Sequence, residues 1–205
     1  MERQAGFLDV MRYRDFRLLW IGQLISITGS QMRIVAVDWL VYQIATAQGM
    51  SAPLALGLIG LLRMIPMTIM ALFAGVVADR YERRKVIMVT SFIALSASAI
   101  LAVAAQLEEP MLWVVYGMVV VTAIASAFEM PARQALIPAL VPREVLSQAM
   151  SANIIAWQLA TVVGPSLGGI IIAGFGVVPL FWFDAASYLA VVAAAVMMKP
   201  VAVAS

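Results

Sequence analysis

The sequence predicts an all-α integral membrane protein with six transmembrane helices. Its composition is unlike that of a soluble domain: 64% of the residues are hydrophobic and 12% are charged, whereas soluble domains carry about a quarter charged residues. The apolar residues lie in six long runs, and a membrane-spanning helix needs about 20 such residues. Because backbone groups in hydrocarbon must be paired within each segment, continuous apolar runs favour helices over the alternating strands of a barrel.

The six runs follow one another through short connections. The first is too long for the apolar part of a cleaved signal peptide. A polar stretch at 129–144 contains three prolines and is expected to be a loop or a short surface helix. Residues 1–17 are expected to precede the six-helix bundle of residues 18–198, and 199–205 to begin a linker. The runs themselves cover residues 18–45, 54–78, 86–107, 111–128, 145–173 and 178–198.

Arginine and lysine residues outside the runs indicate the orientation of the bundle. They lie before the first run, between the second and third, between the fourth and fifth, and after the sixth. The three other connections contain none. The positive-inside rule therefore predicts a multi-pass protein of the inner (plasma) membrane with both termini in the cytoplasm.

Four charged residues lie inside the runs: Arg33, Asp38, Arg63 and Asp184. Each costs roughly 3 kcal/mol near the bilayer centre, so all four are expected to face a polar interior. Gln31 and Asp38, seven residues apart, mark one stripe of the first helix. Asp38 and Arg63 lie about 10 and about 13 Å from the outer ends of their helices. They are expected to meet, either as a static ion pair or as titrating or substrate-contacting groups in a water-filled cavity.

The connection between the second and third runs has the most specific pattern in the chain. A glycine in this position lets another helix approach closely. Its aspartate can accept hydrogen bonds from a helix N-terminus or pair with a basic residue, and its basic cluster can bind carboxylates or lipid phosphates. The simpler alternative is an ordinary cytoplasmic loop. The residues in question are Gly75, Asp79, Arg80, Arg83, Arg84 and Lys85.

This connection resembles the signature between the second and third helices of the major facilitator superfamily, with Glu82 where the family usually has glycine. A second stretch, 160–169 in the fifth run, resembles the glycine–proline signature of the antiporters of this superfamily, with Ala160 in place of its leading glycine. Proline frees a backbone carbonyl and glycines permit a close helix crossing. The matching residues of the second stretch are Gly164, Pro165, Gly168 and Gly169.

The segments 131–144 and 183–188 resemble the branch of drug and siderophore exporters, which includes the enterobactin exporter. The resemblance implies a secondary active, proton-coupled exporter of hydrophobic or amphiphilic small molecules. Family members have two six-helix halves. The resemblance therefore also implies a partner, either a C-terminal half of the same protein or a second six-helix chain. The fourth run, 111–128, lacks the intramembrane arginine associated with proton coupling in many antiporters, which makes Asp38 the better candidate carboxylate.

The sequence is also compatible with other functions. The protein could be an importer or lipid flippase of the same fold, or a membrane scaffold or assembly subunit that transports nothing. The chain contains no cysteine and no histidine, so neither an enzyme, a metal site nor a bound cofactor is expected. Nucleic-acid binding is not expected either, because the net charge is only +2 and the basic residues lie in loops.

Overall fold

The structure, a computed structural model, describes residues 7–198, apart from the side chains of residues 7, 8, 76, 78 and 79. Within this range it is helical and contains no strand, and six of the helices are long and apolar enough to cross a membrane. The prediction of an all-α protein with six spans is confirmed. The helices are α1 (Phe7–Val10), α2 (Arg14–Ala47), α3 (Ala52–Arg80), α4 (Arg83–Ala104), α5 (Leu112–Leu140), η1 (Arg143–Val145), α6 (Leu146–Phe175) and α7 (Val178–Met197).

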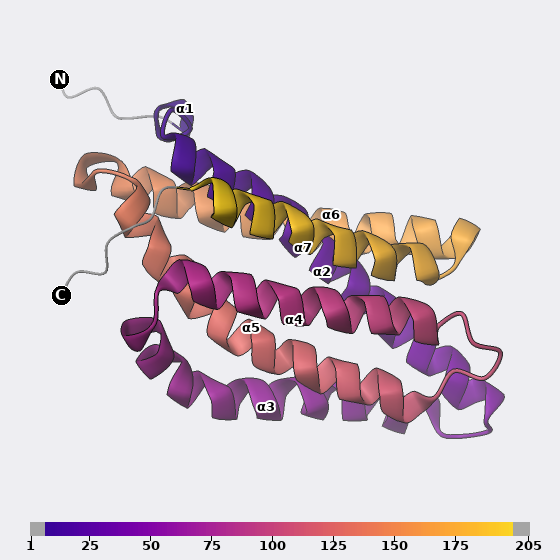
Figure 1. The fold of residues 1–205 in the computed structure, drawn as a ribbon. Helices are drawn as coiled ribbons and strands as arrows, with labels where there is room; N and C mark the ends of the chain where they lie inside the picture. The colour runs from indigo at the N-terminus through magenta and orange to yellow at the C-terminus, as the bar shows by residue number, and fades with distance from the viewer. Residues whose placement is uncertain (1–6, 199–205) are drawn as a thin grey trace.

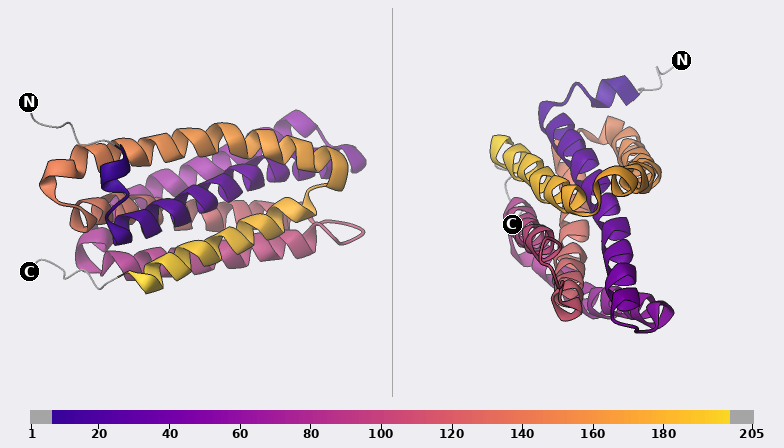
Figure 2. Two further views of the ribbon diagram at one scale, coloured as in Figure 1. Left: turned by 90° about the horizontal axis from the view of Figure 1, so that it is seen from above. Right: turned by 90° about the vertical axis from the view of Figure 1, so that its right-hand side faces the viewer.

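The six long helices run along a common direction, and consecutive helices are antiparallel (Figure 1). Helix α2 crosses the bundle between two groups, α6 and α7 on one side and α3, α4 and α5 on the other (Figure 2). It packs most extensively on α6 and α7, while α4 joins the two groups through α7. This arrangement gives α2 a neighbour in both groups, so its side chains reach the centre of the bundle.

The two ends of the bundle differ in charge. The start of α2 and the α3–α4 and α5–α6 connections lie at one end (Figure 1), and this end carries Arg14, Arg83, Arg84, Lys85 and Arg143. We call it the basic end. The opposite connections, residues 48–51, 105–111 and 176–177, contain no arginine or lysine. The predicted orientation, with both termini in the cytoplasm, depends on this difference in basic residues between the two ends.

Two apolar clusters fill the bundle, and buried polar residues lie between them. One cluster, around Val37, Leu101 and Phe181, occupies the half away from the basic end. The other, around Phe16 and Ile137, occupies the basic half. The buried polar side chains between them include Ser26, Arg33, Ser91, Ser98, Thr122, Asp184 and Ser187.

The expectation of a loop or short surface helix at 129–144 is wrong, because α5 continues as one helix to Leu140. Pro131 and Pro138 each remove a single backbone donor. Against that loss, Leu136 and Ile137 are buried in the apolar cluster of the basic half, and Arg133 pairs with a carboxylate one turn earlier. Tertiary packing therefore outweighs the prolines. The ends of the other long helices lie within a few residues of the expected ones.

Candidate functional site

A cavity of about 300 Å³ lies between α2, α3, α5, α6 and α7. Four charged side chains line it: Arg33, Arg63, Glu129 and Arg133. Its wall also has polar and apolar parts, so the cavity is a mixed surface inside an otherwise apolar bundle. The uncharged lining residues are Gln23, Ser26, Ile27, Ser30, Gln31, Ile34, Met67, Thr122, Ala123, Ser126, Met130, Gln134, Asn153, Trp157 and Tyr188.

The cavity extends from the middle of the bundle towards the basic end. At a rise of about 1.5 Å per residue, Arg63 lies about 17 Å from the start of α3 at the opposite end. Arg133 lies about 10 Å from the end of α5 at the basic end. The charged groups therefore sit at two levels, and both lie well inside their helices.

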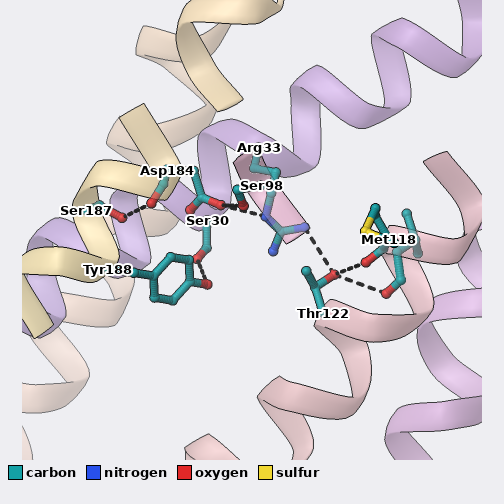
Figure 3. Close-up of polar contacts among 9 residues, drawn as sticks. Ser30, Arg33, Ser98, Met118, Thr122, Asp184, Ser187 and Tyr188 are labelled. Atoms are coloured by element: carbon teal, nitrogen blue, oxygen red, sulfur yellow. Dashed lines mark hydrogen bonds and ion pairs between the residues drawn. The ribbon is translucent and has the colours of Figure 1, made fainter. Parts of the chain in front are cut away.

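The deeper level is organised by a buried ion pair between α2 and α7. The Nε of Arg33 donates to Oδ2 of Asp184 at 2.8 Å, and its Nη1 donates to Oγ1 of Thr122 at 3.3 Å. The hydroxyl of Ser98 donates to the same Asp184 oxygen at 2.5 Å. Four helices thus meet at one carboxylate and one guanidinium (Figure 3). Asp184 is fully buried and Arg33 is 6% exposed, so neither charge faces lipid.

Sequence reasoning placed Arg33 and Asp184 in a polar interior but did not pair them with each other. The two residues are 151 positions apart, in the first and last spans. The sequence did contain a signal for this pair. Arg33 and Asp184 have opposite charges and neither had an assigned partner, and an unpaired charge in the membrane is expensive. Beside the pair, the hydroxyls of Ser30 and Tyr188 are hydrogen-bonded at 2.9 Å (Figure 3).

Asp38 and Arg63 lie together, as their depths suggest, but the contact is loose. Oδ1 of Asp38 and Nη2 of Arg63 are 3.9 Å apart, and the side chains are 47% and 36% exposed. Neither side chain makes a hydrogen bond to any other described residue. Arg63 lines the cavity, whereas Asp38 does not. Gln31, from the same stripe of α2, also lines the cavity and donates to Oγ1 of Thr161 at 3.4 Å.

The second charged level is a pair within α5 that sequence reasoning missed. Oε1 of Glu129 accepts from Nε of Arg133 at 2.8 Å and also from its Nη2. Both residues are 7% exposed. The fourth span therefore does contain a buried arginine, because it continues past Phe128, and the expectation that it lacks one is wrong. The signal was the spacing of four residues, which places a carboxylate and a guanidinium on one helix face.

The two arginines that follow the turn between α3 and α4 bind backbone carbonyls of other helices. Nη1 of Arg83 donates to the carbonyl of Ala135 in α5 at 2.8 Å. Arg84 donates to the carbonyls of Val196 and Met198, both at 3.1 Å. Lys85 pairs with Glu82 at 3.0 Å. The loop thus connects the basic ends of α5 and α7.

The other residues of this predicted site contribute less to the described structure. Arg80 is exposed at the end of α3. Gly75 has no described atom within 4 Å of the position that a Cβ would occupy. Asp79 belongs to α3, but its side chain lies outside the described residues.

The glycine–proline stretch of α6 lies against α2. A Cβ on Gly164 would come within 2.5 Å of the Gln31 Cβ and 3.0 Å of the Thr28 carbonyl oxygen. Gly168 also faces α2, at van der Waals distance from Met32, whereas Gly169 has no described neighbour. Pro165 lies between them within the helix. The absence of side chains at 164 and 168 therefore allows α6 to pack closely on α2.

Six membrane-spanning helices around a charged cavity define a multi-pass membrane protein of the kind that forms transporters. Residues 5–205 match the family described as transmembrane secretion effector. The chain belongs to this family, a branch of the major facilitator superfamily, and such membership indicates a transporter rather than an enzyme.

Three relatives show how far the similarity extends. The enterobactin exporter EntS of Salmonella typhimurium is 32% identical over 180 residues, which cover 86% of this chain and 42% of that protein. The uncharacterized MFS-type transporter YfiS of Bacillus subtilis is 30% identical over 170 residues, 83% of this chain and 39% of its own. The macrolide efflux protein A of Streptococcus pyogenes is 25% identical over 165 residues, with coverages of 78% and 39%. The chain therefore spans about two fifths of the length of these relatives. No solved structure matches it.

Proposed function

We propose that this chain forms one half of a secondary active exporter of hydrophobic or amphiphilic small molecules. The observation that carries the proposal is the cavity, because three arginines from three different membrane-spanning helices line it. Charges at this depth are expensive and mark substrate or ion pathways in membrane proteins. The names of two relatives, an enterobactin exporter and a macrolide efflux protein, support export as the direction.

A second six-helix half would complete the cavity, either as the C-terminal part of the same protein or as another chain. The spans in α3 and α6 are the least buried of the six, and both contribute to the cavity wall. A partner half packed against these two helices would close the cavity and cover their exposed apolar side chains, among them Leu58 and Leu61 of α3. The two halves would then face each other across a central path.

Asp38 is the carboxylate best suited to carry a coupling proton. Three carboxylates lie within the spans near the cavity, and two of them are held by hydrogen bonds. Asp184 accepts from Arg33 and Ser98, and Glu129 accepts twice from Arg133. Asp38 is half-exposed and has only the 3.9 Å contact with Arg63. It can therefore bind or release a proton without losing a hydrogen bond.

The basic end is proposed to face the cytoplasm, in the inner membrane, as the positive-inside rule requires. In this orientation the α3–α4 connection acts as the conformational switch. Arg83 and Arg84 hold the basic ends of α5 and α7 through three hydrogen bonds. Opening the cavity at this end would require these bonds to break, and closing it would restore them.

The test is transport by the full gene product that contains this chain, expressed in inverted membrane vesicles. The probe is N-phenyl-1-naphthylamine, an uncharged apolar dye that fluoresces in the membrane. An acid-inside pH gradient should drive its uptake, and nigericin, which collapses the gradient, should abolish that uptake. Uptake equal to that of vesicles without the protein, with or without the gradient, would contradict the proposal and favour a scaffold.

A further inference from the structure

We infer that the deep end of the cavity binds an oxyanion, so that the molecule exported is an amphiphile with an acidic group. The inference rests on the proposed transport function and specifies its substrate class. It concerns the level at which Arg33 and Arg63 line the cavity. The binding groups would be the guanidinium of Arg63 and the Nη2 of Arg33.

The two arginines lie at the same depth. The hydroxyl of Tyr116 on α5 donates to the Ala55 carbonyl on α3 at 3.0 Å, which sets the register of these two parallel helices. Arg63 is eight residues beyond Ala55, and Thr122, the partner of Arg33, is six residues beyond Tyr116. The difference of two residues is about 3 Å along the helix axis. Two positive charges therefore face one region of the cavity, where they repel each other.

Fixed contacts leave part of each guanidinium group available to a ligand. Arg33 is held by Asp184 through Nε and by Thr122 through Nη1 (Figure 3). Its Nη2 takes part in neither of these two bonds, and the hydroxyl of Tyr188, which also lines the cavity, interacts with the same guanidinium group. Arg33 is only 6% exposed and lines the cavity. Arg63 makes no hydrogen bond within residues 7–198, and its carboxylate partner is 3.9 Å away. An oxyanion in the cavity could accept charge-assisted hydrogen bonds from both guanidinium groups.

The distribution of charge disfavours a cationic ligand. Among the described residues Glu129 is the only carboxylate that lines the cavity, and it already accepts two hydrogen bonds from Arg133. Asp184 holds Arg33 from outside the cavity wall, and Asp38 does not line the cavity either. Arg133 and Glu129 neutralise each other, so a cation in the cavity would meet Arg33 and Arg63, whose counter-ions lie outside the cavity wall. The apolar lining, from Ile27, Ile34 and Met67, suits the body of an amphiphile.

The test measures binding to the full gene product in nanodiscs of phosphatidylcholine, which has no net charge. Three fluorescent probes of equal length are compared: 11-(dansylamino)undecanoic acid, its methyl ester and the corresponding dansyl alkylamine. The acid should bind at least about tenfold more tightly than the ester or the amine, as expected for a charged hydrogen bond. Equal binding of the acid and the ester, or tighter binding of the amine, would overturn the inference.

Substitutions then locate the site. Arg63→Gln should weaken binding of the acid about tenfold and leave the ester unchanged, whereas Arg63→Lys should keep most of the affinity. Arg143→Gln, which removes an exposed charge outside the cavity, is the matched control and should change neither. The double variant Arg33→Gln/Asp184→Asn should also lose selectivity for the acid, without leaving a lone buried charge. Unchanged selectivity in both cavity variants would overturn the site.

The outcomes separate this inference from the proposed function. Uptake of the uncharged dye together with equal binding of acid and ester would reject the oxyanion site and leave the exporter intact. Failure of uptake and of all probe binding would reject both. Replacing a quarter of the lipid by phosphatidylglycerol distinguishes two sources of the oxyanion. If phosphatidylglycerol displaces the acid, the natural occupant of the site is a lipid headgroup. If it does not, the occupant is a soluble amphiphile. Either result is consistent with an oxyanion site.

Discussion

Arg33 on α2 and Asp184 on α7 form an ion pair at 2.8 Å in which the carboxylate is completely buried. A buried pair of this kind contributes little net stability compared with an apolar pair, but the loss of one partner leaves an uncompensated charge. The pair also fixes the direction of the Arg33 guanidinium towards the cavity, through the additional bond to Thr122. It therefore has separable effects on folding and on the shape of the cavity.

Removal of one member of this pair should destabilise the protein more than removal of both. Arg33→Gln leaves the buried Asp184 carboxylate without its counter-ion, and the free energy of unfolding should fall by about 3 to 5 kcal/mol. Arg33→Gln/Asp184→Asn leaves two neutral amides that can bond to each other and to Ser98, so most of the loss should be recovered. Thermal unfolding in detergent measures both variants against the unsubstituted protein. An equal fall of Tm in the single and double variants would show that the pair is not energetically coupled.

The contact of α6 with α2 should tolerate no side chain at position 164. Gly164→Ala places a methyl group 2.5 Å from the Gln31 Cβ, and such overpacking costs about 1 to 3 kcal/mol. Gly169→Ala is the matched control, because it has no described neighbour. Both substitutions gain the same helix propensity, up to about 1 kcal/mol. The difference in Tm between them therefore isolates the packing, and equal Tm values would contradict this account of the crossing.

Single cysteines should distinguish the cavity from the lipid-facing surface. The chain has no native cysteine, so each introduced thiol is the only one. Ser126→Cys lines the cavity and should react with a membrane-impermeant methanethiosulfonate reagent. Phe92→Cys lies on an exposed apolar part of α4, outside the cavity, and should stay protected by lipid. The reaction is carried out in native membranes, and mass spectrometry then measures the fraction of each thiol that is labelled. Protection of both positions would count against a water-filled cavity and for the scaffold alternative.

Asp38→Asn should separate proton coupling from anion binding. The amide cannot exchange a proton, so dye uptake driven by an acid-inside gradient should fall to the level of vesicles without the protein. The same change removes the carboxylate that competes for Arg63, so the dansyl acid should bind about threefold to tenfold more tightly. Uptake assays and equilibrium binding measure the two effects. Gradient-driven uptake at the unsubstituted rate would exclude Asp38 as the proton site.

The six spans could be predicted from the sequence because each depends on local hydropathy. The meeting of Asp38 and Arg63 could also be anticipated, since consecutive helices are joined by a short turn and their depths follow from the helix rise. The Arg33–Asp184 pair could not be predicted from the sequence. Tertiary packing decides which of the later spans lies beside the first one. No periodicity within a single helix carries that information.

The cavity was only partly predictable for a related reason. Residues 129–144 contain three prolines and several charges, which locally indicate a loop. The helix continues because its apolar side packs on the basic half of the bundle, and this contact brings Glu129 and Arg133 into the cavity wall. Arg83 and Arg84 were expected to bind carboxylates or phosphates. Their actual partners are carbonyls near the ends of α5 and α7, whose positions depend on the same packing.

The separation of Arg33 and Asp184 by 151 residues also has a consequence for biosynthesis. The first span leaves the ribosome with a positive charge whose counterion belongs to the last span of the bundle. Until α7 has been synthesised and inserted, Arg33 must stay near water, the translocation channel or an insertion chaperone, because lipid alone does not accommodate it. The pair can therefore close only after α7 has been inserted, so the packed centre of the bundle cannot form before the last span is in place. Nascent chains interrupted before α7 would expose a charge in the membrane that quality-control proteases can recognise.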